Sequence, residues 1–220
     1  MLPVKRLAAA NQRLAGGVSA GDRRRLAEAM FLDALTKIRR CRNLDETIVV
    51  TAYPKVARTA RWLGTEVLRQ AEDGSHSRAA SAGAQAAIAR GADRVAMLPA
   101  DCPLFDPEEL DARLGTTPQS ALIVPDRHGH GTNALILSPP DALAPAFGPD
   151  SCARHVSRAR AAGIAFSLAE IPSLALDLDT FEDLVVLRDR LVIAPERAPR
   201  TAEVIFDLEA AAEVGSQAVA

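Results

Sequence analysis

The hydrophobic positions of the chain alternate between short apolar runs and longer stretches with helical spacing. The short runs are rich in aliphatic and β-branched residues, which predicts buried strands. The expected strands are Leu2–Val4, Thr47–Thr51, Thr65–Leu68, Val95–Leu98, Ala121–Val124, Ala134–Leu137 and Leu174–Thr180. Helical patterns separate most of them. This order predicts an α/β fold built on a doubly wound, mostly parallel sheet.

Capping signals place the expected helices. Ser19, followed three residues later by Asp22, opens a helix that runs to about Arg40. Asp106 before Pro107 is the N-cap of another. The remaining helices are expected over Pro54–Leu63, over Ser77–Arg90, from Asp150 or Ser151 to about Ala162, and from Thr180 to about Arg190.

The composition changes from Pro195 onward, where proline, arginine and then alanine dominate. We therefore expect a folded domain over residues 1–194 and a C-terminal linker and tail over residues 195–220. The apolar triplet Val204–Phe206 is expected to pack on the domain or on a partner subunit, so a homodimer is one expectation for assembly.

Net charge and cysteine content indicate which partners and which cellular location to expect. The chain of 220 residues has a formal net charge of −2, which argues against nucleic acid or a membrane surface as a partner. Its three cysteines are scattered and lack metal-ligand spacing, as expected of reduced thiols. The sequence shows neither a signal peptide nor an apolar stretch of membrane-spanning length, so a cytoplasmic location is expected.

Asp101 is the first candidate for chemistry. It follows the apolar run Val95–Leu98, and ligands of such sheets bind beyond the carboxyl ends of the strands. Because Asp106 already explains the start of the next helix, Asp101 is left without a capping role. Two interpretations stay open for Asp101 at this point, a turn residue and a magnesium ligand.

Two further acids supply the partners that a metal site needs. If residues 174–180 form a strand, Asp177 and Asp179 point to one side while Leu176 and Leu178 face the core. Neighbouring carboxylates repel each other unless a cation neutralises them. Together with Asp101 they predict a site for one or two Mg²⁺ ions completed by substrate phosphates, although Asp179 is also a candidate helix cap.

Two polar loops are candidates for binding an anion. Residues 128–133 combine two glycines with Thr132 and Asn133, which suits either a ligand-binding loop or an ordinary hairpin. His128 and His130 lack a nearby third metal ligand. Gly148 and Ser151 precede a helix whose N-terminus, with Arg154 and His155, suits an anion, while capping alone also explains Ser151.

Several of these segments together resemble the guanylyltransferases of coenzyme F420 biosynthesis. The resemblance covers roughly residues 2–190 in unbroken order. It rests on Leu2-Pro3-Val4-Lys5, Pro99-Ala100-Asp101-Cys102-Pro103-Leu104, Pro125–Leu135 with its Gly-Thr-Asn loop, Phe147-Gly148-Pro149-Asp150-Ser151, and Ala175–Thr180. The resemblance implies a Rossmann-like, glycosyltransferase-A-type nucleotidyltransferase fold with a mostly parallel mixed sheet, and transfer of GMP from GTP to phosphoenolpyruvate or 2-phospho-L-lactate.

The resemblance also assigns roles to individual residues. It implies that Thr132, Gly148 and Ser151 bind phosphoenolpyruvate. The hypothesis that Asp101, Asp177 and Asp179 hold Mg²⁺ fits the same reaction. Lys5, with Arg13, would contact the nucleotide phosphates, and Lys5 and Asp101 would serve catalysis. The chain departs from the family by lacking the usual lysine of the phosphate loop and the Gly-Leu-Asn element after Gly74. A nucleotidyltransferase acting on a sugar phosphate or molybdopterin, and a non-catalytic nucleotide-binding module, therefore stay open.

Overall fold

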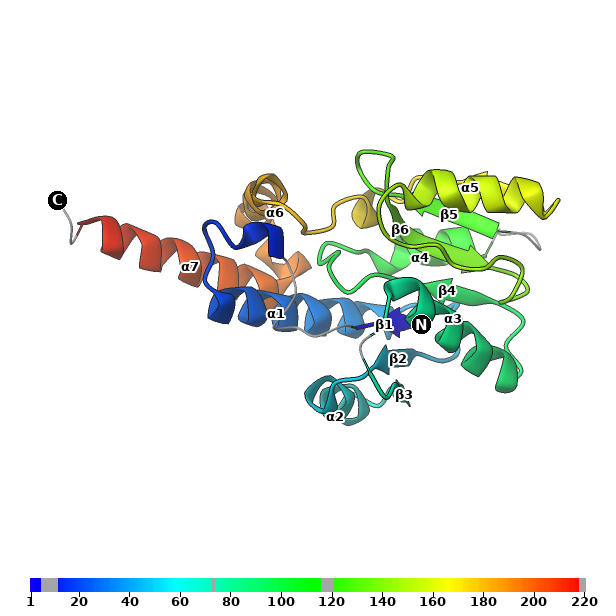
Figure 1. The fold of residues 1–220 in the computed structure, drawn as a ribbon. Helices are drawn as coiled ribbons and strands as arrows, with labels where there is room; N and C mark the ends of the chain where they lie inside the picture. Colours follow the sequence, from blue (N-terminus) through cyan, green and yellow to red (C-terminus); the bar gives the residue numbers. More distant parts are fainter. Residues whose placement is uncertain (5–11, 73, 116–120, 218–220) are drawn as a thin grey trace.

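The computed structural model describes residues 1–4, 12–72, 74–115 and 121–217. Within these ranges the strands form two sheets that are joined through the first residues of the chain (Figure 1). Strands β1 (Leu2–Pro3), β2 (Ile48–Thr51) and β3 (Glu66–Arg69) are parallel. The other sheet has the order β4-β6-β5-β7, with β4 (Val95–Met97), β5 (Ala121–Pro125), β6 (Thr132–Leu137) and β7 (Phe166–Leu168).

Two backbone hydrogen bonds connect the sheets into one continuous layer. The Met1 amine donates to the carbonyl of Ala96, and the Leu98 amide donates to the carbonyl of Met1, so β1 runs beside β4. Strand β6 is antiparallel to both β4 and β5, while β7 is parallel to β5. The prediction of an α/β fold with a mixed sheet is confirmed.

Helices cover both faces of this layer because side chains alternate along each strand. One face packs on α1 (Ala20–Ile38), α2 (Pro54–Trp62) and α4 (Pro107–Leu114) through residues such as Val49, Leu98 and Ile136. The opposite face packs on α3 (His76–Ala89) and α5 (Ser151–Ala161) through neighbours in the same strands, among them Val50 and Met97.

A third apolar cluster lies outside the sheet. It joins α1, α6 (Phe181–Ile193) and α7 (Pro199–Gln217) through Leu26, Leu187 and Ile205. Helix α7 runs along α1 and carries the C-terminal end away from the sheet (Figure 1). The segment expected to be a linker and tail therefore contains a short 3-10 turn, η4 (Pro195–Arg197), and a packed helix. The division of the chain at residue 194 stays a prediction, as does a homodimer.

The structure lacks one expected strand and contains one that was not expected. Residues 174–180 form no strand: the 3-10 turn η3 (Pro172–Leu174) is followed by extended, unpaired chain as far as the start of α6. Strand β7, which the sequence pattern did not indicate, forms the edge of the second sheet and exposes Leu168. Cys41, Cys102 and Cys152 are buried free thiols. Among the described helices, none has the length and apolar character needed to cross a membrane.

Helix α7 is held to α1 by a buried carboxylate. Asp33 of α1 is 2% exposed and accepts hydrogen bonds from the Thr201 amide (2.9 Å) and hydroxyl (2.8 Å). Arg200 donates to its other oxygen at 3.2 Å. The carboxylate thus satisfies the first turn of α7 from a neighbouring helix.

We predict that Asp33→Ala lowers the free energy of unfolding by about 2–3 kcal/mol, because it leaves buried donors without an acceptor. Denaturant unfolding measures this loss. The control is Asp207→Ala, which removes an exposed ion pair of Asp207 with Arg25 between the same two helices and should cost less than about 1 kcal/mol. Equal losses in the two variants would contradict the assigned role of Asp33.

Candidate active site

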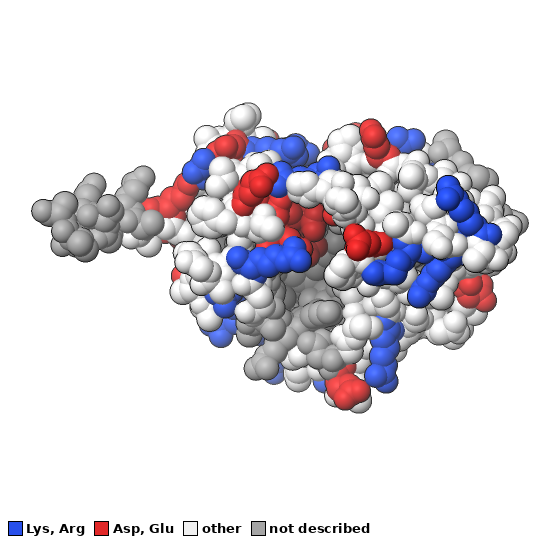
Figure 2. Space-filling view, turned by 45° about the horizontal axis from the view of Figure 1, so that its top comes forward, with Lys and Arg blue, Asp and Glu red and all other residues white. Residues whose placement is uncertain are grey.

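A pocket of about 480 Å³ opens at the edge of the second sheet where β4 ends and β6 begins. Figure 2 shows acidic side chains gathered in a hollow of the surface, with Lys and Arg side chains around it. The pocket is lined by residues from distant parts of the chain, including the predicted Arg13, Asp101, Thr132, Gly148, Ser151, Asp177 and Asp179. Lys5, predicted to contact the nucleotide phosphates, lies outside the described residues.

The three predicted acids meet without the expected strand. The amide of Leu178 donates to the carbonyl of Asp101 at 3.0 Å, which ties the segment before α6 to the loop after β4. Leu176 and Leu178 are 2% and 1% exposed and enter the third apolar cluster. Alternation along the extended chain therefore leaves Asp177 and Asp179 lining the pocket beside Asp101.

The electrostatics of the acids follow from burial and from their mutual repulsion. Burial, then the charges of Asp177 and Asp179, raise the pKa of Asp101 to about 7. Burial also raises the pKa of Asp177, against a hydrogen bond from the Asn133 amide at 3.1 Å that favours the charged form. The carboxylates are thus held together at a free-energy cost that a cation would remove.

The donor set fits a divalent cation that also binds the substrate. Within the described ranges, no three His, Cys, Asp or Glu side chains are arranged closely enough to hold a metal ion by themselves. Arg13 contacts Asp179 at 3.2 Å, but both side chains are more than half exposed, so their attraction is weak. Oxygen ligands with open positions match the usual arrangement for Mg²⁺, which takes phosphate oxygens as further ligands.

A carboxylate that sequence analysis did not select shapes the Gly-Thr-Asn loop. Asp126 accepts hydrogen bonds from the amides of His128 (3.1 Å), His130 (2.9 Å) and Gly131 (2.8 Å). A Cβ at position 131 would lie 2.6 Å from its carboxylate oxygen, so a side chain there would push the Asp126 carboxylate out of this position. Thr132 and Asn133 belong to β6 and not to the loop, which places their side chains on a rigid strand.

Asn133, like Asp126, contributes more to the site than the sequence pattern indicated. Its side-chain amide donates to the carbonyl of Leu174 at 2.7 Å and to the carboxylate of Asp177. These hydrogen bonds fix residues 174–179, which we call the acid segment, relative to β6. The sequence indicated only a polar side chain near a glycine, and the partners of Asn133 lie more than 40 residues away.

The loop before α5 forms the other wall of the pocket. Gly148 has φ +112°, a backbone conformation that favours glycine. The first amides of α5 are already used: Ser151 donates to the carbonyl of Gly148, and Cys152 donates to the carbonyl of His130. Arg154, expected to contact an anion, instead donates twice to the carbonyl of Ala146. Arg154 is therefore engaged with the protein and does not line the pocket, whereas Ser151 lines it beside Gly148. Anion binding at this helix terminus stays a prediction.

His155, expected to face an anion beside Arg154, is fully buried. Its ring contacts Phe147 edge to face, with centroids 5.2 Å apart. Phe147 in turn meets the ring of His76 at 4.9 Å, and both of these residues line the pocket. The sequence pattern placed Phe147 in the Phe-Gly-Pro-Asp-Ser motif, but it assigned no role in the site to Phe147 or to His76.

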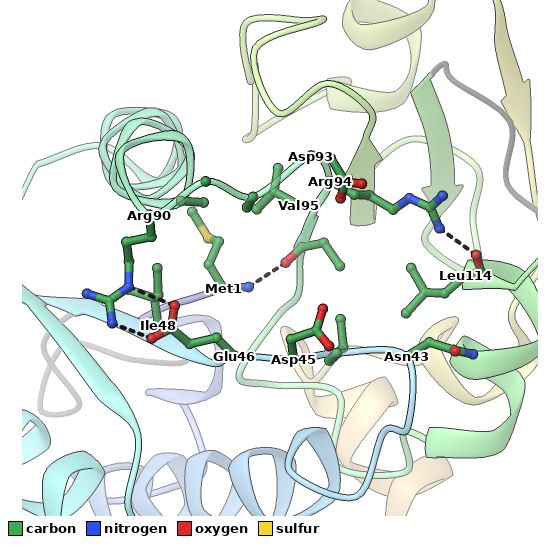
Figure 3. A pocket seen from close by; sticks show the side chains of 15 residues that line it. Met1, Asn43, Asp45, Glu46, Ile48, Arg90, Asp93, Arg94, Val95 and Leu114 are labelled. Carbon is green, nitrogen blue, oxygen red and sulfur yellow. Dashed lines mark hydrogen bonds and ion pairs between the residues drawn. The ribbon is translucent and has the colours of Figure 1, made fainter.

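A second cavity, of about 500 Å³, lies at the opposite end of β4 (Figure 3). Both of its arginines are engaged with protein groups: Arg90 pairs with Glu46, and Arg94 donates to the carbonyl of Leu114. None of the predicted site residues with a described position lines this cavity. The arrangement of convergent acids and hydroxyls belongs to the first pocket.

Comparison with known proteins agrees with this geometry. Residues 1–198 match the family described as guanylyl transferase CofC like. A phosphoenolpyruvate guanylyltransferase of Conexibacter woesei is 48% identical over 192 residues, covering 86% of each chain. Another, from Sphaerobacter thermophilus, is 37% identical and covers 84% of this chain and 89% of its own. A structure from Desulfovibrio desulfuricans, described as a nucleotide-diphospho-sugar transferase, superposes with a TM-score of 0.76 at 19% identity, covering 95% of this chain and 94% of its own, which shows a shared fold.

The buried His155 makes the stability of the fold depend on pH. Burial, then the nearby Arg158 and Arg154, lower the pKa of His155 from 6.5 to about 4. Between these values the unfolded chain binds a proton that the folded chain does not, so stability falls as the pH falls from 6.5 toward 4. We predict that this group alone removes about 3 kcal/mol over that interval.

The measurement is the free energy of unfolding at pH 7 and at pH 4.5, in the natural chain and in His155→Gln. Because the other titrating groups are common to both, the difference between the two pH slopes isolates His155. The natural chain should lose more stability than the variant on acidification. Parallel slopes would show that His155 does not change its proton affinity on folding.

Proposed function

Because this chain belongs to the CofC-like guanylyl transferase family, we propose that it transfers GMP from GTP to phosphoenolpyruvate and releases pyrophosphate, as a step of coenzyme F420 biosynthesis. The two relatives described above carry the name phosphoenolpyruvate guanylyltransferase at 48% and 37% identity. The observation that carries the proposal is a single pocket that joins Asp101 and Asp177 to Thr132, Gly148 and Ser151. Such a pocket suits two anionic substrates that must approach each other.

The reaction requires alignment and charge neutralisation and no protein nucleophile. A phosphate oxygen of phosphoenolpyruvate attacks the α-phosphorus of GTP, and the bond from that phosphorus to the bridging oxygen of the β-phosphate breaks. Pyrophosphate leaves with the electron pair of that bond. Phosphoryl transfers of this type are accelerated mainly by positioning and by stabilisation of the phosphate charges.

We assign the metal site to the three acids. Asp101, Asp177 and Asp179 would hold Mg²⁺ together with phosphate oxygens, and the bound ion supplies charge neutralisation at the reacting phosphates. The raised pKa of Asp101 supports this assignment, because burial and then repulsion by Asp177 and Asp179 disfavour its charged form, and a bound cation would offset both effects. Asn133 would keep Asp177 in place through its hydrogen bond to the carboxylate.

We assign the binding of the acceptor, phosphoenolpyruvate, to the wall of the pocket that faces the three acids. Thr132 and Ser151 are almost fully buried and offer hydroxyl donors at fixed positions, and Gly148, which has no side chain and a positive φ, would let the backbone approach the ligand closely. Arg13 would steady the leaving pyrophosphate, for which it would have to exchange its contact with Asp179. Lys5 is proposed for the same role from the family resemblance alone. A cytoplasmic location is part of the proposal and is consistent with three buried thiols.

We predict that phosphoenolpyruvate is the preferred acceptor. The purified protein with GTP and Mg²⁺ should release pyrophosphate with phosphoenolpyruvate, and mass spectrometry should find the GMP adduct of phosphoenolpyruvate. Parallel reactions contain 2-phospho-L-lactate, phosphoglycerate, a sugar phosphate or molybdopterin. A faster reaction with one of these would replace the proposed acceptor, and no pyrophosphate with any of them would favour a non-catalytic binding module.

We also predict the effect of substituting Asp101. Asp101→Asn keeps the shape of the side chain and removes its charge, so kcat should fall roughly a hundredfold or more while the fold persists. The thermal midpoint of the variant should equal or exceed that of the natural chain, because the substitution removes a carboxylate whose charged form is disfavoured by desolvation and then by repulsion from Asp177 and Asp179. Asp45→Asn, at the far cavity, is the charge-matched control. Activity near normal in Asp101→Asn would remove this residue from the metal site.

A further inference from the structure

His155 connects the two elements that carry the proposed acceptor site. Its Nδ1 lies 2.9 Å from the hydroxyl oxygen of Thr132 at the start of β6. Its Nε2 lies 2.8 Å from the amide nitrogen of Ala146, in the loop that leads to Gly148 and Ser151. The side chain is fully buried and does not line the pocket. Any effect of His155 on a ligand must therefore pass through Thr132 or through this loop.

The two hydrogen bonds determine where the ring proton lies. A backbone amide can only donate, so Nε2 of His155 accepts from Ala146 and carries no hydrogen. A neutral imidazole then has its hydrogen on Nδ1, which donates to the oxygen of Thr132. The reverse direction, from the Thr132 hydroxyl to Nδ1, would require an imidazolate.

This direction leaves the hydroxyl hydrogen of Thr132 for another acceptor. Within the described part of the chain, no second protein group is hydrogen-bonded to this hydroxyl. Thr132 lines the pocket, where the proposed acceptor carries carboxylate and phosphate oxygens. Donation from His155 polarises the O–H bond, which makes Thr132 a stronger donor toward an anion.

We infer that His155 is a positioning residue that holds the Thr132 hydroxyl as a hydrogen-bond donor to the anionic acceptor, and that fixes the loop of Gly148 and Ser151 at the matching distance. The inference rests on the proposed function, because it gives Thr132 an anionic partner.

The charged groups around the imidazole support a permanently neutral ring. On its own helix, Arg154 and Arg158 are the nearest cations, and both donate to carbonyls of residues 144–146. From the preceding loop, Phe147 contributes an aromatic edge, and β6 contributes the Thr132 hydroxyl. A proton on Nε2 would meet the amide hydrogen of Ala146. Burial and the two arginines lower the pKa of His155 to about 4, which agrees with this exclusion.

Two substitutions separate the contacts of the ring. In His155→Asn the side-chain amide can reach the place of Nδ1 and still donate to Thr132, while in His155→Gln the carbonyl can reach the place of Nε2 and accept from Ala146 without supplying Thr132. His155→Gln should raise the KM for phosphoenolpyruvate about tenfold and leave the KM for GTP within about twofold. His155→Asn should raise the KM for phosphoenolpyruvate by a smaller factor. A larger effect of Asn than of Gln would overturn the assignment to Thr132.

A double-mutant cycle with Thr132→Val tests whether the two side chains act as one unit. Thr132→Val removes the hydroxyl, so adding His155→Gln to it should change the KM for phosphoenolpyruvate by less than about twofold. Multiplicative effects would show that His155 does not act through Thr132. The control is Ser157→Gln, an exposed position on the same helix, which should leave both KM values unchanged.

A spectroscopic measurement tests the hydrogen-bond direction without using activity. In a ¹⁵N-histidine correlation spectrum of the natural chain at pH 7, one of its four histidines should be the neutral tautomer protonated at Nδ1, and His155→Gln should lack that signal. An Nε2-protonated or charged ring would overturn the inference. If the natural chain released no pyrophosphate with any acceptor, the proposed function would fail, while this spectrum would still decide the state of His155.

Discussion

A backbone hydrogen bond from the amide of Leu178 to the carbonyl of Asp101 joins the two segments that carry the acids of this pocket. It fastens an unpaired segment to the loop at the end of β4, and the burial of Leu176 and Leu178 fixes which side chains face inward. Neither interaction involves a charged group. Together they nevertheless hold close to one another carboxylates that would move apart in an unfolded chain because of their mutual repulsion. The apolar cluster around α1, α6 and α7 is therefore part of the site, although none of its members reacts.

The opposite wall is built on a different principle. Because β6 is antiparallel to β4 and β5, its first residues lie at the same edge as the carboxyl ends of those strands. Asp126 holds the turn before Thr132, and Arg154, His155 and Arg158 of α5 hold the loop before Ser151. Hydrogen bonds within the protein thus hold the turn and the loop of this wall before a ligand arrives, which reduces the ordering that binding requires.

Local patterns and the family resemblance together predicted the fold and several of the residues that line the pocket. Strand runs, helix caps and the alternation of Leu176 to Asp179 are encoded within a few residues. The same reasoning assigned a strand to residues 174–180, since alternation occurs in any extended chain, whether or not a neighbouring strand pairs with it. It missed β7, where Leu168 is exposed and Phe166 half-buried, because an edge strand needs only weak apolar character.

Partners far apart in the chain account for the other differences. Asp33 and Thr201 are separated by 168 positions, so nothing near residue 199 reveals that α7 is capped from α1. The position of Asn133 between the acid segment and β6 depends likewise on tertiary packing. Arg154 shows the converse case: its charge suggested an anion, but the nearby carbonyl of Ala146 takes its hydrogen bonds. Residue type indicates which chemistry is available, and packing decides which part of it remains for a ligand.

The central claim is that Asp101 and Asp177 bind one divalent cation together with the nucleotide. Mn²⁺ binding, followed by electron paramagnetic resonance in the presence of GTP, tests it directly in the natural chain, in Asp101→Asn, in Asp177→Asn and in the exposed control Asp141→Asn. The account predicts that either pocket substitution weakens Mn²⁺ binding at least about tenfold and that the control does not. Binding of equal strength in Asp101→Asn and the natural chain would contradict it.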